Sequence, residues 1–292
     1  MKSKKTFTVH LYQVITADKS KPLADLLEEV EGLSLEQRIR KINDREMRLE
    51  HVSKNDKGLW HLDFGLLRFD NGPGRASKKT PVTDFDLKIG EGFGEETAAI
   101  YDPASGYLAL QYNHFGARVS AIAAYLSTLD EKPNSYEFRL SLDDSAVARL
   151  KKKTIFTKIE MKVAPGKLSK AFKENNVSLY SALAAQQKEF GGDIVTVVVG
   201  LEKNSNKSLS IANKITSLLG LASDEPDAVS TLQVSGKESQ TASIDLVDLL
   251  EESRTTQFKD LPLSSGLRYP LSDRFNRLQR AFNGWKADKA IP

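Results

Sequence analysis

Two carboxylates and a lysine follow one another in an order that metal-dependent nucleases use. Asp143 or Asp144 comes first, and a predicted strand then carries Glu160 and Lys162 on one face. In such a site the carboxylates hold Mg²⁺ and the lysine orients water or stabilises charge. The same Glu-x-Lys pattern is also typical of a solvated, charge-paired strand face. The nuclease is therefore an alternative, and we assign no catalytic residue.

The other motifs that could carry chemistry are weaker. His61 and Asp63 share one side of a predicted strand, with His51 across a hairpin, but alternation places polar residues on a solvent face routinely. The glycine-rich segment Gly90–Gly94 lies among glutamates that would repel a phosphate. The chain has no cysteine, which excludes thiolate metal sites, disulfides and a cysteine nucleophile. We predict no metal and no cofactor.

The formal net charge of +3 conceals a segregation of charge along the chain. Arg149–Lys173 holds nine basic residues against Glu160 alone, and Arg268–Lys289 holds six against two acids. Between them, Asp224–Glu252 holds eight acids against one lysine. Two separate basic segments favour a surface that binds a polyanion.

No motif for reading base edges is visible, so the pattern predicts phosphate contacts that are independent of DNA sequence. Changing Lys151, Lys152 and Lys153 together to Glu is expected to abolish binding and to leave the fold intact. The residues predicted to contact duplex DNA are Lys151, Lys152, Lys153, Lys158, Lys162, Lys167, Lys170, Lys173, Arg274, Arg277 and Arg280.

Segments of period 2 and of helical period follow one another without a βαβα alternation. This order predicts an α+β protein, with antiparallel sheets and flanking helices. A capping box at the start of Ser34–Ile42 predicts a helix there, and Leu209–Leu219 also has a helical pattern. Phe85–Ile89 alternates like a strand, and Ile194–Val199 is the most apolar strand of the chain.

We expect two lobes of similar size, residues 1–134 and a basic lobe of residues 135–292. The final helix belongs to the second lobe in this scheme. Its apolar residues recur at spacings of 4, 3, 4 and 3, which produces a seam that either docks on its own domain or forms a dimer contact. The seam consists of Leu271, Phe275, Leu278, Phe282 and Trp285.

No stretch approaches the roughly 20 apolar residues of a membrane span. The basic residues at the start of the chain are not followed by the apolar run of a signal peptide. We therefore expect a cytoplasmic protein that does not insert into a membrane.

Two blocks of the chain resemble a known family. Ala98–Asp102, a turn, Gly106–Ala109 and then His114–Gly116 running into an amphipathic helix are similar to the central hairpin of the RexA-like phage exclusion proteins. Lys158–Val163, followed by a helix and the apolar strand Ile194–Val199, resembles the next block of that family. The basic final helix lies in the corresponding place, whereas the first ninety residues depart from the pattern.

This resemblance implies a dimer that binds duplex DNA with little sequence preference, in a fold related to the recombination-associated RdgC proteins. It also implies a sensor or regulator in antiphage defence (abortive infection) that works with a separate effector protein. The sequence favours such a binding protein over an enzyme. Two alternatives stay open: the Mg²⁺-dependent nuclease described above, and a protein-interaction module that uses the acidic segment and the final seam and binds no nucleic acid.

Overall fold

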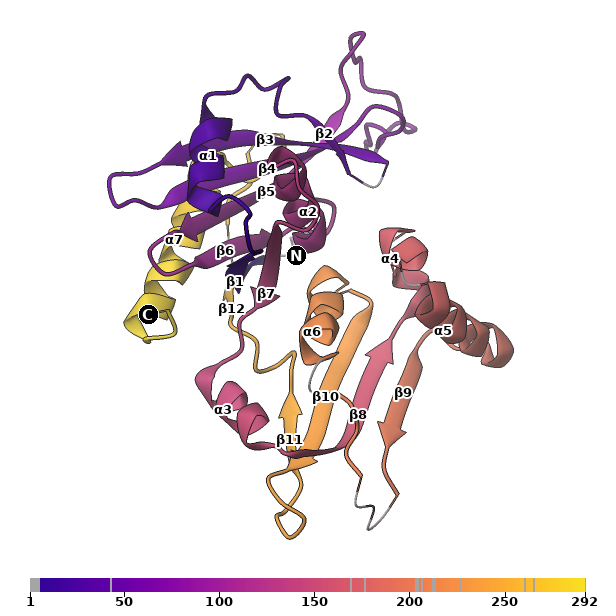
Figure 1. The fold of residues 1–292 in the computed structure, drawn as a ribbon. Coiled ribbons are helices and arrows are strands. Elements are labelled where there is room, and N and C mark those ends of the chain that lie inside the picture. The colour runs from indigo at the N-terminus through magenta and orange to yellow at the C-terminus, as the bar shows by residue number, and fades with distance from the viewer. Residues whose placement is uncertain are drawn as a thin grey trace. The chain divides into compact units, whose positions relative to one another are not determined.

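The computed structural model shows an α+β fold, as the sequence predicts (Figure 1). It describes residues 6–42, 44–168, 170–175, 177–202, 205, 207–211, 214–225, 227–259, 261–264 and 266–291. The elements in chain order are β1 (Phe7–Thr16), α1 (Leu23–Glu31), β2 (Arg40–Ile42), β3 (Arg45–Lys54), β4 (Trp60–Arg68), β5 (Phe93–Asp102), β6 (Tyr107–Tyr112), α2 (Val119–Leu129), β7 (Tyr136–Leu140), α3 (Asp144–Lys152), β8 (Ile155–Val163), the 3₁₀ turn η1 (Pro165–Lys167), α4 (Lys170–Asn175), α5 (Val177–Phe190), β9 (Val195–Gly200), α6 (Ile215–Asp224), β10 (Val229–Lys237), β11 (Asp245–Asp248), β12 (Thr255–Phe258) and α7 (Leu271–Ala287).

The chain forms two structural units. Unit 1 contains residues 1–9, 14–138 and 256–292, and unit 2 contains residues 10–13 and 139–255. This differs from the expected lobe of residues 135–292, because the final helix belongs to unit 1. The reason is the apolar seam, whose Leu278, Phe282 and Trp285 are buried against strands of unit 1.

Unit 1 is organised by an eight-stranded sheet with the order β12-β1-β6-β5-β4-β3-β2, in which β7 also pairs with β1. The side chains of Trp60, Leu62 and Phe64 on β4 are fully buried, and α1 and α2 supply further core residues. The helix α7 packs on β5 and β6. The seam thus serves the core of its own unit rather than presenting an apolar surface to a second molecule.

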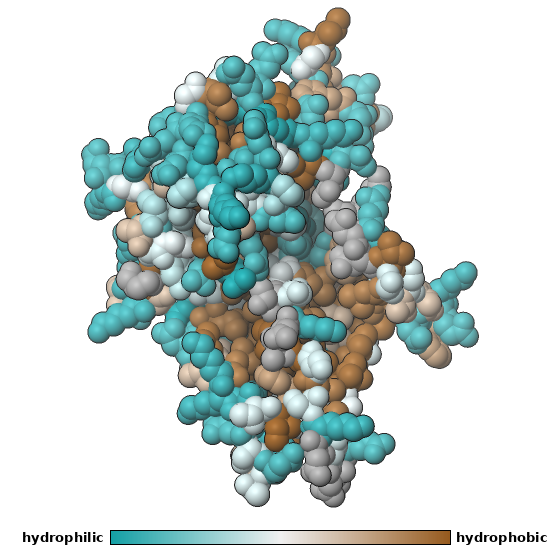
Figure 2. Space-filling view, viewed as in Figure 1, coloured by the Kyte–Doolittle hydropathy of each residue, from teal (hydrophilic) through white to brown (hydrophobic). Residues whose placement is uncertain are grey.

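Unit 2 contains a four-stranded antiparallel sheet with the order β11-β10-β8-β9. Met161 pairs with Leu232 and Ile159 with Val234, so that apolar residues of β8 and β10 share one face. The helix α6 contacts β10. Figure 2 shows apolar surface gathered over this sheet.

Three expected elements take a different form. Ser34 and Gln37 do make their reciprocal capping bonds, but a turn and the strand β2 follow instead of a helix. The cause is tertiary: the Arg38 guanidinium donates to three backbone carbonyls, and the Tyr125 hydroxyl donates to the Arg38 carbonyl. Phe85–Ile89 is not a strand, since it lies exposed in a loop without a pairing strand. The helix expected at Leu209–Leu219 begins later and is α6.

No helix of the described residues has the length and apolar character needed to cross a bilayer.

Candidate nucleic-acid interface

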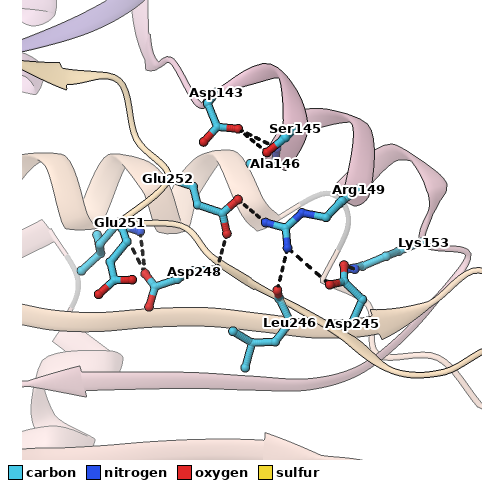
Figure 3. A network of polar contacts seen from close by, with 11 residues as sticks. Asp143, Ser145, Ala146, Arg149, Lys153, Asp245, Leu246, Asp248, Glu251 and Glu252 are labelled. Carbon is cyan, nitrogen blue, oxygen red and sulfur yellow. Dashed lines mark hydrogen bonds and ion pairs between the residues drawn. The ribbon is translucent and has the colours of Figure 1, made fainter.

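The predicted basic segment begins on α3, where its charges pair with the acidic segment of the same unit. Arg149 forms ion pairs with Asp245, at 3.3 Å, and with Glu252. Lys153 also pairs with Asp245, and Arg254 pairs with Asp144 at 3.0 Å. Figure 3 shows Arg149 and Lys153 pointing from the helix side toward these carboxylates. Two charges of the basic segment, those of Arg149 and Lys153, are therefore neutralised by the acidic segment within the fold.

This network also bonds the outward backbone groups of β11, which is one edge strand of the four-stranded sheet. Leu249 donates its amide to the Leu232 carbonyl, so Leu246 and Asp248 direct their backbone groups away from β10. The Leu246 carbonyl accepts a bond from Arg149 at 3.1 Å, and the Asp248 amide donates to the Glu252 carboxylate at 3.1 Å (Figure 3). The side chains thus satisfy backbone groups that a sheet edge would otherwise expose.

Lys153 has a structural role that differs from the predicted DNA contact. Its side chain is 2% exposed, and its ammonium group donates to Asp245. This hydrogen bond holds the pKa of Asp245 below its ordinary value, against the opposing effect of burial. Changing Lys153 to Glu would place two carboxylates together in the network, so we now expect the triple lysine change to destabilise unit 2 as well.

Other lysines of the segment keep exposed ammonium groups. Lys151, Lys152, Lys162 and Lys167 are exposed and have no acidic partner among the described residues. In the sequence, two of them lie at the end of α3 before β8, one lies on β8 and one lies in η1 after it. They are the members of the predicted set that remain available to phosphates.

The remaining lysines of the segment have local partners or lie outside the description. Lys158 pairs with Glu160 at 3.2 Å across one side of β8, which is the charge-paired strand face. Lys173 lies over the Tyr180 ring, 5.3 Å from its centre. The Lys170 side chain is not among the described side chains.

The three arginines of α7 differ in their environment. Arg274 is 3% exposed and binds the buried Asp63 through both guanidinium ends, at 2.6 and 2.9 Å. Glu96 lies 3.7 Å from the same guanidinium. Arg277 and Arg280 lie instead over the Phe258 ring, each 5.4 Å from its centre. Arg274 is thus a core residue of unit 1, whereas Arg280 is exposed.

The carboxylates of the nuclease alternative are used for other bonds. Asp143 caps α3 by accepting the Ala146 amide at 2.8 Å, and Asp144 pairs with Arg254. Glu160 pairs with Lys158. In the described part of the chain, no three His, Asp or Glu side chains are placed to hold a metal ion. Among the described residues, no contact favours the nuclease.

His51 and His61, whose spacing resembles a weak metal site in the sequence, lie beside α7. His61 stacks on Phe275 with 4.8 Å between the ring centres, and His51 lies 5.5 Å from the same ring. Burial lowers the pKa of His61, and the neighbouring His51 lowers it further. Asp63, the third residue of that group, is held by Arg274. The cluster therefore belongs to the packing of α7 on its sheet.

The sequence did not indicate that Asp245, Glu252 and Asp63 are the partners of the basic residues. One signal was available: the acidic segment has nearly as much charge as the first basic segment, with the opposite sign. Segments matched in this way can neutralise each other in the fold. The long sequence separation, 103 residues between Arg149 and Glu252, hides the pairing.

A family model matches residues 1–271, and the chain belongs to that family, DUF6731, which is described as a family of unknown function. No curated protein matches the chain.

Proposed function

We propose that this DUF6731 member binds duplex DNA without sequence preference, through the exposed lysines along β8 of unit 2. The observation that carries the proposal is that Lys151, Lys152, Lys162 and Lys167 have no acidic partner among the described residues. The charge of these lysines is not used by the fold, in contrast to that of Arg149 and Lys153.

The spacing of the lysines supports a duplex as the ligand. A strand rises about 3.3 Å per residue, so the nine residues of β8 span roughly 30 Å. That length is close to one turn of B-form DNA, about 34 Å. Lys158 and Lys162 lie on one face of the strand, while Lys151 and Lys152 lie at the end of α3 and Lys167 lies in η1, before and after β8 in the sequence. Each phosphate contact releases counterions and adds affinity that is independent of sequence.

The biological setting that we propose is antiphage defence in the cytoplasm, with this protein as sensor or regulator. The resemblance of two blocks to the RexA-like phage exclusion proteins supports this part of the proposal. In the structure the first of these blocks is the hairpin of β5 and β6, and the second begins with β8. A homodimer and a separate effector protein belong to the same proposal.

The test is a salt titration of binding to a random-sequence duplex, measured by fluorescence anisotropy. We compare the wild-type protein with the triple variant Lys151→Gln, Lys152→Gln, Lys162→Gln. The logarithm of affinity falls with the logarithm of salt concentration with a slope of about −0.9 per phosphate contact. The triple variant is expected to lose about three contacts, so the slope should become shallower by about 2.7.

The matched control is Lys57→Gln, Lys78→Gln, Lys79→Gln, which removes the same charge from exposed sites of unit 1. Equal slopes for both triple variants would contradict the β8 row. Absence of binding at low salt would favour the protein-interaction module instead. A gel of the recovered DNA, with and without Mg²⁺, detects the cleavage that the nuclease alternative requires.

A further inference from the structure

The two edge strands of the sheet in unit 2, β11 and β9, differ in whether their outward backbone groups are bonded. At β11, Arg149 and Glu252 bond the outward backbone groups, and α3 contacts the strand. At β9 no described strand or side chain bonds the outward backbone groups. Natural sheets protect their edges with short strands, charges or covering elements, because a bare edge pairs with other chains.

The backbone of β9 presents a row of unpaired groups. The Leu201 amide donates to the Thr157 carbonyl at 2.9 Å, and bonded pairs alternate along an antiparallel ladder. The register pairs Val199 with Ile159 and Val197 with Met161 as the bonded partners. Thr196, Val198 and Gly200 therefore direct their N–H and C=O groups away from β8. Among the described residues, these groups have no partner.

The side chains of β9 favour pairing of this edge with another strand. The strand reads Val-Thr-Val-Val-Val-Gly, with no charge and no proline, so it lacks the usual devices against edge pairing. Val198 is 55% exposed and Val199 is 47% exposed, although valine favours burial. By contrast, the edge strand β2 of the other sheet has three residues, of which two are charged.

We propose that β9 is a homodimer interface, at which two copies of this chain pair antiparallel through this strand. A two-fold axis at Val198 opposes Val198 to its own counterpart and Thr196 to Gly200. The three outward residues of each copy then exchange six hydrogen bonds, and two four-stranded sheets become one of eight strands. A two-fold pairing uses both edges at once and leaves none open to further copies.

Apolar residues are exposed on and next to β9. Phe190, at the end of α5 just before β9, is 79% exposed, and Ile194 is 59% exposed. With Val198 and Val199 they expose on the order of 500 Å² per copy, close to the apolar share of the roughly 800 Å² that each partner buries in a standard interface. The β9 strand of a second copy matches this strand in polarity, since it is equally uncharged.

The experiment measures the mass of the full chain by light scattering and sedimentation. We expect the wild-type protein at twice the chain mass of 32.4 kDa. Val198→Lys places two lysines directly opposite each other, with their Cβ atoms about 5 Å apart, so the dimer dissociation constant should rise at least about 100-fold. Val198→Glu alone should do the same, and an equal mixture of the two variants should restore the dimer. Val82→Lys, at an exposed valine of unit 1, is the control and should stay dimeric.

A cysteine variant tests the register and does not depend on how the charged variants fold. The chain has no native cysteine, so Val198→Cys is the only thiol in its variant. Opposed Cα atoms at a bonded pair are about 5.5 Å apart, within disulfide range, whereas the Thr196→Cys counterparts would be more than about 10 Å apart. Oxidation should cross-link the first variant and not the second. A monomeric wild-type protein at about 100 µM, or dimers of both charged variants alone, would overturn the proposal.

Discussion

Replacement of Arg274 by methionine tests whether this arginine holds unit 1 together or serves a ligand. The sequence placed Arg274 among the DNA contacts, on the flank of an amphipathic helix. In the structure both ends of its guanidinium bind Asp63, at 2.6 and 2.9 Å, and both residues are 3% exposed. Methionine preserves the length and helix propensity of the side chain and removes only its charge and donors.

The magnitude follows from what the substitution leaves behind. Asp63 would stay buried without its cation, and removal of one partner of a buried pair costs about 3–5 kcal/mol of unfolding free energy. Asp63→Asn should cost less, because Arg274 still has Glu96 at 3.7 Å. The double variant Asp63→Leu, Arg274→Met removes both charges and should recover most of the stability.

The assay can follow unit 1 alone. The chain has two tryptophans, Trp60 and Trp285, and both are buried in unit 1. Urea unfolding followed by tryptophan fluorescence therefore reports the unit that contains the Asp63–Arg274 pair. Arg280→Met on the same helix is the control, and should cost at most about 1 kcal/mol, because it loses only a partly exposed contact with Phe258.

The loss should also depend on pH. Burial raises the pKa of Asp63 even in the presence of Arg274, which acts in the opposite direction. Without Arg274 the pKa of Asp63 rises further, so the carboxyl group binds a proton more readily in the folded variant than in the unfolded chain. Stability of the variant relative to wild type must then decrease as pH rises from 5 to 8. A loss below 1 kcal/mol at pH 8, or a loss equal to that of Arg280→Met, would refute a structural role for the pair.

Two further predictions concern unit 2. Burial lowers the pKa of His10 from 6.5 to about 4. The stabilisation that is present above pH 6.5 is therefore lost as pH falls toward 4, by about 3 kcal/mol in total. His10→Gln should show a flatter dependence of unfolding free energy on pH, measured by urea unfolding and far-UV circular dichroism, and equal pH profiles for the variant and wild type would contradict this assignment. Lys153→Met should destabilise the unit by about 2 kcal/mol through loss of its partly buried bond to Asp245, whereas Lys152→Met, at an exposed site, should change stability by less than about 0.5 kcal/mol. Similar effects of the two substitutions would show that Lys153 is not part of the network.

The sequence predicted the elements whose pattern is local. The hairpin of β5 and β6 and the capped start of α3 have their signals within a few residues, in a turn and an N-cap. The segment after Ser34 shows the limit of this reasoning. Its capping box forms, but bonds from Arg38 and Tyr125 to distant backbone groups outweigh the weak local preference for a helix.

The candidate site was predictable in part, for a similar reason. A run of basic residues indicates where positive charge lies along the chain, but the fold decides which charges meet an acid. Lys152 and Lys153 are neighbours in the sequence, yet one is exposed and the other is buried beside Asp245. Arg274 and Arg280 differ in the same way, because the turn of α7 directs only Arg274 into the core. A count of charges along the sequence cannot distinguish the buried residue from the exposed one in such pairs.

The proposed dimer and the proposed DNA contact meet on one surface, although each can fail alone. The register places Lys162 beside Thr196 and Glu160 beside Val198, so the β8 lysines lie one strand from the proposed axis. In the combined sheet of the proposed dimer, the β8 strands of the two copies would be three strand spacings apart, about 14 Å. Two antiparallel lysine rows at that distance would reach the phosphates of both strands of one duplex. If Val198→Lys produced a monomer with a shallower salt slope, the dimer would be the DNA-binding form. If it produced a monomer with an unchanged slope, each β8 row would bind on its own.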